Sequence, residues 1–515
     1  MRGRYASLAA PLLLAAVPLV TLLANNIADV SPRFAMRPLL ATLVFSFLVI
    51  GACAALLRDR ERSLVVASLM VLLLSAGTVG ESVRASLPEA FADSAAAGVQ
   101  VLWVLAILAA CGIVIQRAQP PKGLGPILFA VALPMLLIPA MTIIRYEADL
   151  AHPYPLVSRV APSRHTSLET LPDVYYIILD GYGRQDVLDE LYHADNQDFL
   201  DGLTRLGFYV AEGSLANYGQ TNLSLASSLN MVYLDELGDR LGEGNQDPGP
   251  INRLIRHNQV RETLESLGYQ VFAFETGYRK TEWEDAEHYS VPPSAAASAF
   301  EALYAEVLGL TPLSRWMVQR GWVEEMPGYA AHRNRIRFAF EQADALGASS
   351  TPKLVFLHVI LPHPPFVFDS HGAPVTSSQS FQMKDGTEFT GSLQEYTEGY
   401  SDQVEYAGQL TLQLASRLIQ ESARPIVIVI QGDHGPGSRL DWEVPERSDL
   451  RERMGILNAY YAPLAGRELY PTITPVNSFR VILNQYFGFD LPLLPDRSYL
   501  SSWRAPYRFV EYREE

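Results

Sequence analysis

Length, composition and charge already exclude several classes of protein. The chain has 515 residues, of which 49% are hydrophobic and 19% are charged, and its formal net charge is −16. A nucleic-acid-binding protein would show a basic surface, so we expect no nucleic-acid partner. The two cysteines, Cys53 and Cys111, both lie in apolar stretches near the N-terminus. The rest of the chain therefore has no thiol for a disulfide, a thiolate zinc site or a cysteine nucleophile.

Five apolar stretches predict a multi-pass helical membrane domain over residues 1–145. Each has about 18–25 residues, the length that crosses the hydrocarbon core of a bilayer as a helix. No charged residue stands in the middle of a stretch, so we expect a membrane anchor rather than a transport pathway. The stretches lie near residues 6–24, 38–56, 63–81, 98–116 and 124–144.

The basic residues between these stretches predict the orientation of the chain in the membrane. They gather before the first stretch, between the second and third, and between the fourth and fifth, whereas the loop after the third is mainly acidic. The positive-inside rule then puts the N-terminus in the cytoplasm. Five spans put the rest of the chain outside the inner (plasma) membrane. The basic residues include Arg2, Arg4, Arg58, Arg117 and Lys122.

The sequence pattern predicts an α/β domain over residues 171–515. A proline-containing linker at 146–170 precedes this domain. Short β-branched runs alternate with helical patterns, as in a mostly parallel, doubly wound sheet. Ligands of such sheets bind just beyond the carboxyl ends of the strands. Polar residues that follow the apolar runs are therefore candidate site residues, whereas residues 370–392 read as a surface excursion. The clearest runs are 174–179, 354–360 and 426–430.

Two of the predicted strands end in acidic residues. Asp180 follows the first run, and Asp433 with His434 follows the last, between two glycines. A carboxylate beside an imidazole is a common pair of metal ligands, although a polar turn after a core strand is the alternative. Because acids follow two strands of one sheet, we favour a metal site that includes Asp180, Asp433 and His434.

A threonine and two histidines are the other candidates. Thr221 stands at or just before the start of a predicted helix, where it is either an N-cap or a nucleophile whose anionic substrate meets the free helix N–H groups. His363 follows the run at 354–360 in a loop stiffened by prolines, as either a structural residue or a general acid or phosphate-oxygen donor. His358 lies inside that run. It is either a core histidine whose ring nitrogens have hydrogen-bond partners within the protein or a substrate contact.

Four segments in this order resemble the alkaline phosphatase and sulfatase superfamily. The likeness is strongest to its membrane-anchored phosphotransferases, namely lipoteichoic acid synthases, phosphoglycerol transferases and phosphoethanolamine transferases. It covers about residues 171–490 and implies an alkaline-phosphatase-like, sulfatase-like catalytic domain in the cell envelope. The segments are DVYYIILDGYG, GQTNLSLASSLN, HVILPHPPF and VIVIQGDHG.

The resemblance also implies roles for individual residues. Asp180, Thr221, Asp433 and His434 would be metal ligands, and Thr221 would also be the nucleophile. His363 would bind the substrate or donate a proton, and His358 is a further candidate for substrate binding.

The chain departs from the superfamily at several points. Sulfatases carry a modified Cys or Ser in C/S-x-P-x-R, whereas the run here begins at Thr221 and lacks the Cys, Pro and Arg, which disfavours sulfate-ester hydrolysis of that type. Asp180 stands where lipoteichoic acid synthases carry Glu. No clear second carboxylate–histidine set is present, so we expect one divalent ion, Zn²⁺ or Mn²⁺. No histidine follows His434, and Arg439 is a candidate substrate-binding residue in its place.

These observations together predict a membrane-anchored, metal-dependent phosphoryl-group transferase or hydrolase. It would act on a lipid- or glycan-linked phosphate ester through a covalent intermediate on Thr221, with a membrane lipid or envelope glycan as substrate. One alternative is a sulfuric-ester or phosphodiester hydrolase with the same site. Another is a non-catalytic envelope sensor or assembly protein that keeps the fold, but such a protein would lose the site residues, which are present here.

Overall fold

The protein divides into two compact units. One contains the N-terminal helices up to Ala148 together with two short later segments, and the other contains the α/β fold, which begins at Asp149. Residues 156–161 and 163–170 of the expected linker lie outside the described part of the chain. The computed structural model describes residues 2–84, 89–117, 123–155, 162, 171–293, 317–318, 320–322, 325–326, 328–347, 351–377, 379 and 381–514.

The N-terminal unit contains five helical segments that are long and apolar enough to cross a membrane, as the sequence predicts: Tyr5–Asn25, Pro32–Leu57, Arg60–Gly80, Ser94–Gln116 and Leu124–Leu150. The third begins where the Asp59 side chain caps the backbone N–H of Arg62 at 2.7 Å, the usual way to satisfy a free donor of the first turn. The helices are α1 (Arg2–Asn25), α2 (Met36–Leu57), α3 (Arg60–Val71), α4 (Ala76–Arg84), α5 (Glu89–Gln116) and α6 (Leu124–Leu150), with short 3₁₀ turns before α2 and α4.

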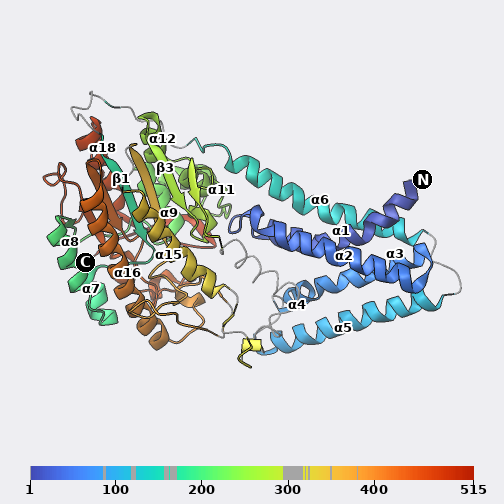
Figure 1. Ribbon diagram of the computed structural model, residues 1–515. Coiled ribbons are helices and arrows are strands. Elements are labelled where there is room, and N and C mark those ends of the chain that lie inside the picture. Colours follow the sequence, from blue (N-terminus) through green and yellow to red (C-terminus); the bar gives the residue numbers. More distant parts are fainter. Residues whose placement is uncertain are drawn as a thin grey trace. The chain divides into compact units, whose positions relative to one another are not determined.

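The second unit is built on a seven-stranded sheet in the order β2-β7-β6-β1-β5-β3-β4 (Figure 1). The five strands from β6 to β4 are parallel, and β7 and β2 are antiparallel at one edge. This confirms the mostly parallel sheet. The strands are β1 (Asp173–Leu179), β2 (Tyr209–Val210), β3 (Gln270–Phe274), β4 (His288–Ser290), β5 (Lys353–Val359), β6 (Ile426–Gln431) and β7 (Asn458–Tyr461).

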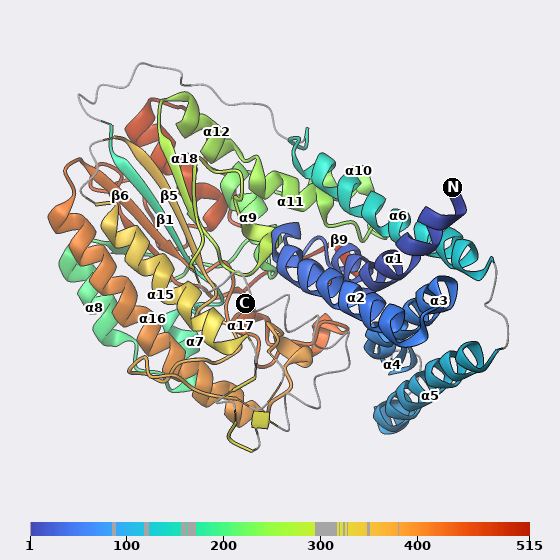
Figure 2. The same cartoon turned by 45° about the vertical axis from the view of Figure 1, so that its right-hand side comes forward.

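Helices cover both faces of the sheet, which explains why its central strands are apolar throughout. Every residue of β1, β5 and β6 is buried. Figure 2 shows α9, α12 and α18 on one face and α15 and α16 on the other. The helices of this unit are α7 (Gln185–Val187), α8 (Gln197–Leu206), α9 (Thr221–Asn230), α10 (Asp235–Leu241), α11 (Gly249–Arg256), α12 (Gln259–Ser266), α15 (Tyr329–Ala345), α16 (Leu393–Glu421), α17 (Leu450–Met454) and α18 (Pro475–Phe487).

The register of β1 fixes where the strand-end acids lie. Ile178 pairs with His358 of β5 on one side and with Gln431 of β6 on the other. Each fully buried aliphatic side chain contributes about 1.5–3 kcal/mol. A slip of one residue would turn each side chain to the opposite face, so the apolar residues of β1 also hold Asp180 in place. Since the strands are parallel, their carboxyl ends meet at one edge of the sheet.

The C-terminal residues form a small second sheet that the sequence patterns did not indicate. It consists of β8 (Ser498–Ser502) and β9 (Ala505–Tyr512), which pair antiparallel. The side chain of Gln220, the residue before α9, donates to the carbonyl of Ser501 at 2.9 Å. The hairpin therefore holds the loop that leads to Thr221.

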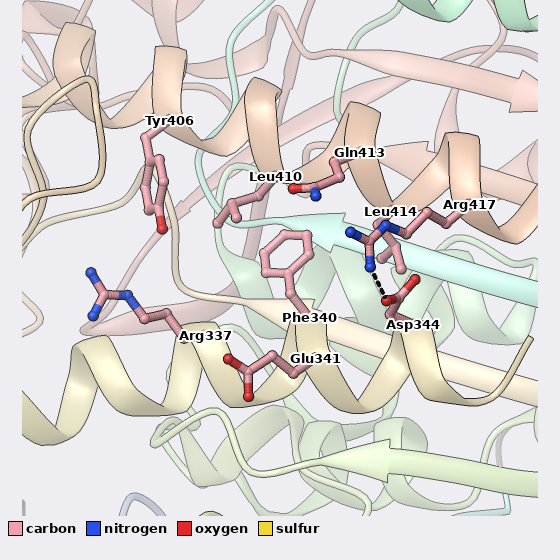
Figure 3. A pocket seen from close by; sticks show the side chains of 9 residues that line it. All are labelled: Arg337, Phe340, Glu341, Asp344, Tyr406, Leu410, Gln413, Leu414 and Arg417. Atoms are coloured by element: carbon pink, nitrogen blue, oxygen red, sulfur yellow. Dashed lines mark hydrogen bonds and ion pairs between the residues drawn. The ribbon is translucent and has the colours of Figure 1, made fainter.

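A groove of about 280 Å³ lies between α15 and α16, within the second unit. Figure 3 shows Phe340 and Leu410 facing one another across it, with the ion pair between Arg417 and Asp344 (2.8 Å) at one end. Its lining contains none of the site residues predicted from the sequence. The predicted ligands Asp180, Asp433 and His434 lie instead at the carboxyl edge of the sheet.

Candidate metal centre

Three of the predicted ligands come together at the carboxyl edge of the sheet. Asp180, Asp433 and His434 each offer a ligand atom within 4.8 Å of the others, and all three are buried. The Nε2 atom of His434 lies 3.6 Å from Asp180 Oδ1 and 3.4 Å from Asp433 Oδ2. Two carboxylates and one imidazole within this distance form a set that suits a divalent ion such as Zn²⁺ or Mn²⁺.

Backbone geometry sets the two turns that carry these ligands. Gly181 has φ +76°, a conformation that favours glycine, and its N–H donates to Asp433 Oδ1 at 3.0 Å. The turn after β6 also depends on a missing side chain, because a Cβ on Gly435 would lie 2.1 Å from the carbonyl oxygen of Glu452. The glycines that mark these turns in the sequence thus allow close approach of the backbone.

The carboxylates give the clearest indication that the site fits a cation. Asp180 Oδ1 and Asp433 Oδ2 are buried and accept no hydrogen bond from any residue that the structure describes. Burial and the neighbouring Asp433 raise the pKa of Asp180 well above its usual range. A buried carboxylate oxygen without a hydrogen-bond partner is costly, so two such oxygens beside one imidazole fit a divalent ion at this position.

His434 presents its Nε2 atom to the cluster in the state that a metal requires. Its Nδ1 atom lies 2.8 Å from the carbonyl oxygen of Gly435 and donates to it, which leaves the lone pair on Nε2. Burial and the nearby charges of Arg453 and His363 hold the pKa of His434 well below its ordinary value. The imidazole is therefore neutral.

Thr221 is the first residue of α9, and its hydroxyl faces the same cluster. Its Oγ1 atom lies 3.0 Å from His434 Nε2. Gln220 occupies the N-cap position, so the hydroxyl is not used as the helix cap. This is where a metal ligand or a nucleophile would stand, and the first N–H groups of α9 lie beside it.

His358 lies behind Asp180. Its Nε2 atom is 3.2 Å from Asp180 Oδ2, and its Nδ1 atom is 2.8 Å from Thr281 Oγ1. Burial lowers the pKa of His358 to about 4, so the neutral ring donates from Nε2 and accepts at Nδ1. Because both ring nitrogens have partners within the protein, these contacts suit a residue that orients Asp180 better than the predicted substrate contact.

His363 lies near the cluster and is less buried than the predicted ligands, with 12% of its side chain exposed. Its ring centre is 6.2 Å from that of His434, and its Nδ1 atom donates to the carbonyl of Pro364 at 2.6 Å. The Nε2 atom is then left for a substrate or for Asp385, whose Oδ2 atom is 3.9 Å away. The position suits the predicted proton donor.

Asp385 and Arg453 belong to the site but were not among the predicted residues. Arg453 Nη1 donates to Asp385 Oδ2 at 2.6 Å, and Arg453 Nη2 lies 3.1 Å from His434 Nε2. Burial alone would raise the pKa of Asp385, but Arg453 and His363 outweigh it and lower the pKa to about 2. Residues 370–392 are therefore not only a surface excursion, because Asp385 is buried within the site.

Arg439 has different neighbours. Its guanidinium is half-exposed and lies 3.6 Å from Asp449, and its backbone N–H donates to Glu452 at 2.9 Å. Among the contacts of the described residues, it is Arg453, not Arg439, that reaches the carboxylate–histidine cluster.

Comparison with known proteins identifies the class to which this fold and site belong. The sulfatase family matches residues 172–461, which is more than half of the chain. No curated protein matches the chain. The chain belongs to the sulfatase family, and it is a sulfatase-like hydrolase or transferase.

Solved structures also resemble the chain, at low identity. The C-terminal periplasmic domain of EcEptC from Escherichia coli is 11% identical over 69% of this chain and 97% of that one, with a TM-score of 0.42. The soluble domain of lipooligosaccharide phosphoethanolamine transferase A from Neisseria meningitidis is 12% identical over 66% and 96%, with a TM-score of 0.40. Phosphonate monoester hydrolase of Agrobacterium radiobacter is 12% identical over 64% and 80%, with a TM-score of 0.41.

Proposed function

We propose that the protein is a membrane-anchored, metal-dependent phosphoryl-group transferase or hydrolase with Thr221 as its nucleophile. The observation that carries this proposal is the position of the Thr221 hydroxyl, 3.0 Å from His434 Nε2, beside two buried carboxylate oxygens without hydrogen-bond partners among the described residues. A divalent ion bound by Asp180, Asp433, His434 and Thr221 would supply Lewis-acid chemistry and favour the deprotonated hydroxyl.

The chain's own residues account for the remaining steps. Thr221 Oγ1 forms a bond to phosphorus and releases its proton to water, while the bond from phosphorus to the leaving oxygen breaks. His363, with Nδ1 tied to Pro364, holds a proton on Nε2 that passes to the leaving oxygen. Water or an acceptor hydroxyl then attacks phosphorus and gives its proton to His363 Nε2, while the bond from phosphorus to Thr221 Oγ1 breaks and Thr221 takes a proton back from water.

A phosphate ester fits this site better than a sulfate ester of the common sulfatase type. The nucleophile position holds Thr221, which is neither of the two residues that give the modified aldehyde nucleophile. A lipid- or glycan-linked phosphate ester is the substrate class that we propose. The five apolar helices would hold the domain near such a substrate, with the N-terminus in the cytoplasm and the α/β domain outside the inner membrane.

The test uses the full-length protein in detergent, loaded with Zn²⁺ or Mn²⁺ and incubated with a phospholipid extract. We expect a phosphorus-containing adduct on Thr221 in the wild type, detected by mass spectrometry of the peptide that contains it. Thr221→Ala should give no adduct and no turnover, and Thr221→Ser should restore both in part because the hydroxyl returns. Turnover of p-nitrophenyl sulfate without an adduct, or full activity of Thr221→Ala, would show that the proposal is wrong.

A further inference from the structure

A buried arginine stands beside the metal ligands and has no role in the chemistry described so far. Arg453 is 2% exposed. Its Nε atom donates to the carbonyl of Gly219 at 2.8 Å, and Nη1 donates to Asp385 at 2.6 Å and to the carbonyl of Gly435 at 3.1 Å. The guanidinium carbon lies 5.2 Å from the ring centre of Trp442. Three of its donor contacts therefore fix the guanidinium in one orientation.

The fourth contact, at Nη2, is the one that changes when the site is loaded. Nη2 lies 3.1 Å from His434 Nε2, and this is the atom through which His434 would bind a metal ion. A nitrogen lone pair that is bound to a metal cannot also accept a hydrogen bond. In the loaded protein, the Nη2 hydrogens would therefore need a different acceptor.

An anion is a suitable acceptor for these hydrogens, because hydrogen bonds between a guanidinium and an anionic oxygen are strong. Asp180, Asp433 and Asp385 contribute three negative charges, and one divalent ion and Arg453 would balance them, so no excess negative charge of the site would repel a bound anion. A guanidinium matches the geometry of phosphoryl oxygens better than an ammonium does. The guanidinium nitrogen Nη2 lies 3.1 Å from His434 Nε2, so Arg453 places a positive charge beside the metal ligands.

We propose that Arg453 is the anion-binding residue of this site and donates from Nη2 to a non-bridging oxygen of the transferred phosphoryl group. Its guanidinium supplies the second positive charge beside the metal ion. Asp385 is a positioning residue, because it acts through Arg453. This inference rests on the proposed phosphoryl chemistry and adds a residue that neither the motifs nor the family match assigns.

Asp385 is itself fixed by its surroundings, as a positioning role requires. Tyr396 donates to Asp385 Oδ1 at 2.7 Å, and the indole N–H of Trp442 donates to the backbone carbonyl of Asp385 at 3.1 Å. Gly437 also contacts this carboxylate closely, since a Cβ at that position would lie 2.6 Å from Asp385 Oδ2. The loop that carries Asp385 is thus packed against the turn that follows β6.

The variants that test this proposal must not leave a buried charge without a partner. Arg453→Met alone would strand Asp385, so the main variant is Arg453→Met with Asp385→Asn, in which both charges are removed. Arg453→Lys keeps the positive charge but loses the planar fork. The matched control removes a second buried ion pair, at the opposite end of the same sheet, through Lys353→Met with Asp173→Asn.

The first measurement is the binding of inorganic phosphate to the full-length protein in detergent, with Zn²⁺ or Mn²⁺ bound. We expect phosphate to raise the unfolding temperature of the wild type and of the Lys353/Asp173 control. We expect no such rise in the Arg453/Asp385 double variant, although its metal content stays at the wild-type level. An equal rise in that variant, or a loss of its metal, would overturn the proposal, because Arg453 would then not bind the anion or would only support His434.

The second measurement is turnover of bis(p-nitrophenyl) phosphate. Loss of one donor to a transition-state oxygen costs about 100- to 1000-fold in kcat, so we expect kcat/KM of the Arg453/Asp385 double variant to fall at least 100-fold. Arg453→Lys should recover part of that loss. A double variant within threefold of the wild type would overturn the inference while leaving Thr221 chemistry intact. Phosphate binding that depends on Arg453 in a wild type without turnover would instead support the anion site and contradict the proposed function.

Discussion

Strand β1 has a buried carboxylate near each of its two ends, and the two are treated differently. At the amino end, Asp173 pairs with the Nζ atom of Lys353, and Arg424 Nε lies 3.3 Å from Asp173 Oδ1. At the carboxyl end, Asp180 Oδ1 accepts no hydrogen bond from the described residues, and its neighbour Asp433 has a second such oxygen. The chain provides its own cations at one edge of the sheet and leaves the acids incompletely paired at the other.

This difference separates a structural carboxylate from a functional one. A buried ion pair adds little to stability compared with apolar residues of similar size, but breaking it is costly. A pair of carboxylates that share one space is costly as folded and gains stability when a cation binds. The same residue type at the two edges of the sheet, in Asp433 and Asp173, therefore predicts opposite responses of stability to the same substitution.

The largest effect should come from Asp433→Asn. The amide keeps an acceptor for the N–H of Gly181, which bonds Oδ1 at 3.0 Å, but it removes one negative charge from the cluster. Replacing even an outer partner of a metal ligand costs about 10- to 100-fold in metal affinity, so a ligand should cost more than 100-fold. We expect loss of bound metal by elemental analysis and no turnover, while the metal-free protein unfolds at the same or a higher temperature.

A lower unfolding temperature of metal-free Asp433→Asn would contradict the comparison, because the carboxylate would then stabilise the fold without a cation. Asp441→Asn is a suitable control, since Asp441 caps a surface loop through the backbone N–H of Glu443 at 2.9 Å.

The next largest effect should come from Asp173→Asn at the amino edge. It leaves the fully buried Lys353 beside a neutral amide, and breaking a buried pair in this way costs about 3–5 kcal/mol. We expect chemical denaturation of the full-length protein in detergent to show this loss, with metal content unchanged. The Lys353→Met, Asp173→Asn double variant should recover most of the loss, and a double variant as unstable as the single one would show that the charge pair is not the cause.

The sequence patterns predicted the parts of this site that local structure determines. The β-branched runs at β1, β5 and β6 predict buried parallel strands, and parallel strands bring the residues after them to one edge. Asp180 and Asp433 with His434 follow from that rule, and Thr221 follows from the start of a helical pattern. The expected carboxylate–histidine cluster is present in the structure.

Asp385 and Arg453 could not be predicted in the same way. They are 68 residues apart in the chain and belong to segments without helical or strand periodicity, so their contact depends on the tertiary fold alone. Asp385–Gly386 also reads as a simple turn, which is the usual role of such a pair. Charge gave no signal either, because one divalent ion already balances the two acids that the patterns predict, Asp180 and Asp433.

The smallest effect concerns pH and another buried group near the carboxyl edge. His332 on α15 is fully buried, and burial, followed by the charges of Arg335 and His363, lowers its pKa to about 3. In the unfolded chain this histidine binds a proton below about pH 6.5, whereas the folded protein keeps it neutral. Its contribution to stability is therefore complete above pH 6.5 and is lost progressively as the pH falls towards 3, by about 1 kcal/mol at pH 5.5.

We expect His332→Gln to lose less stability than the wild type between pH 8 and 5.5, measured by chemical denaturation of the metal-free protein in detergent. The quantity of interest is the difference between the two slopes of unfolding free energy against pH, because the substitution also changes packing at every pH. His288→Gln makes the same change at a half-exposed position and is the matched control. If His332→Gln and the wild type have equal slopes, the cost of protonation at this edge lies in the carboxylate cluster and not in α15.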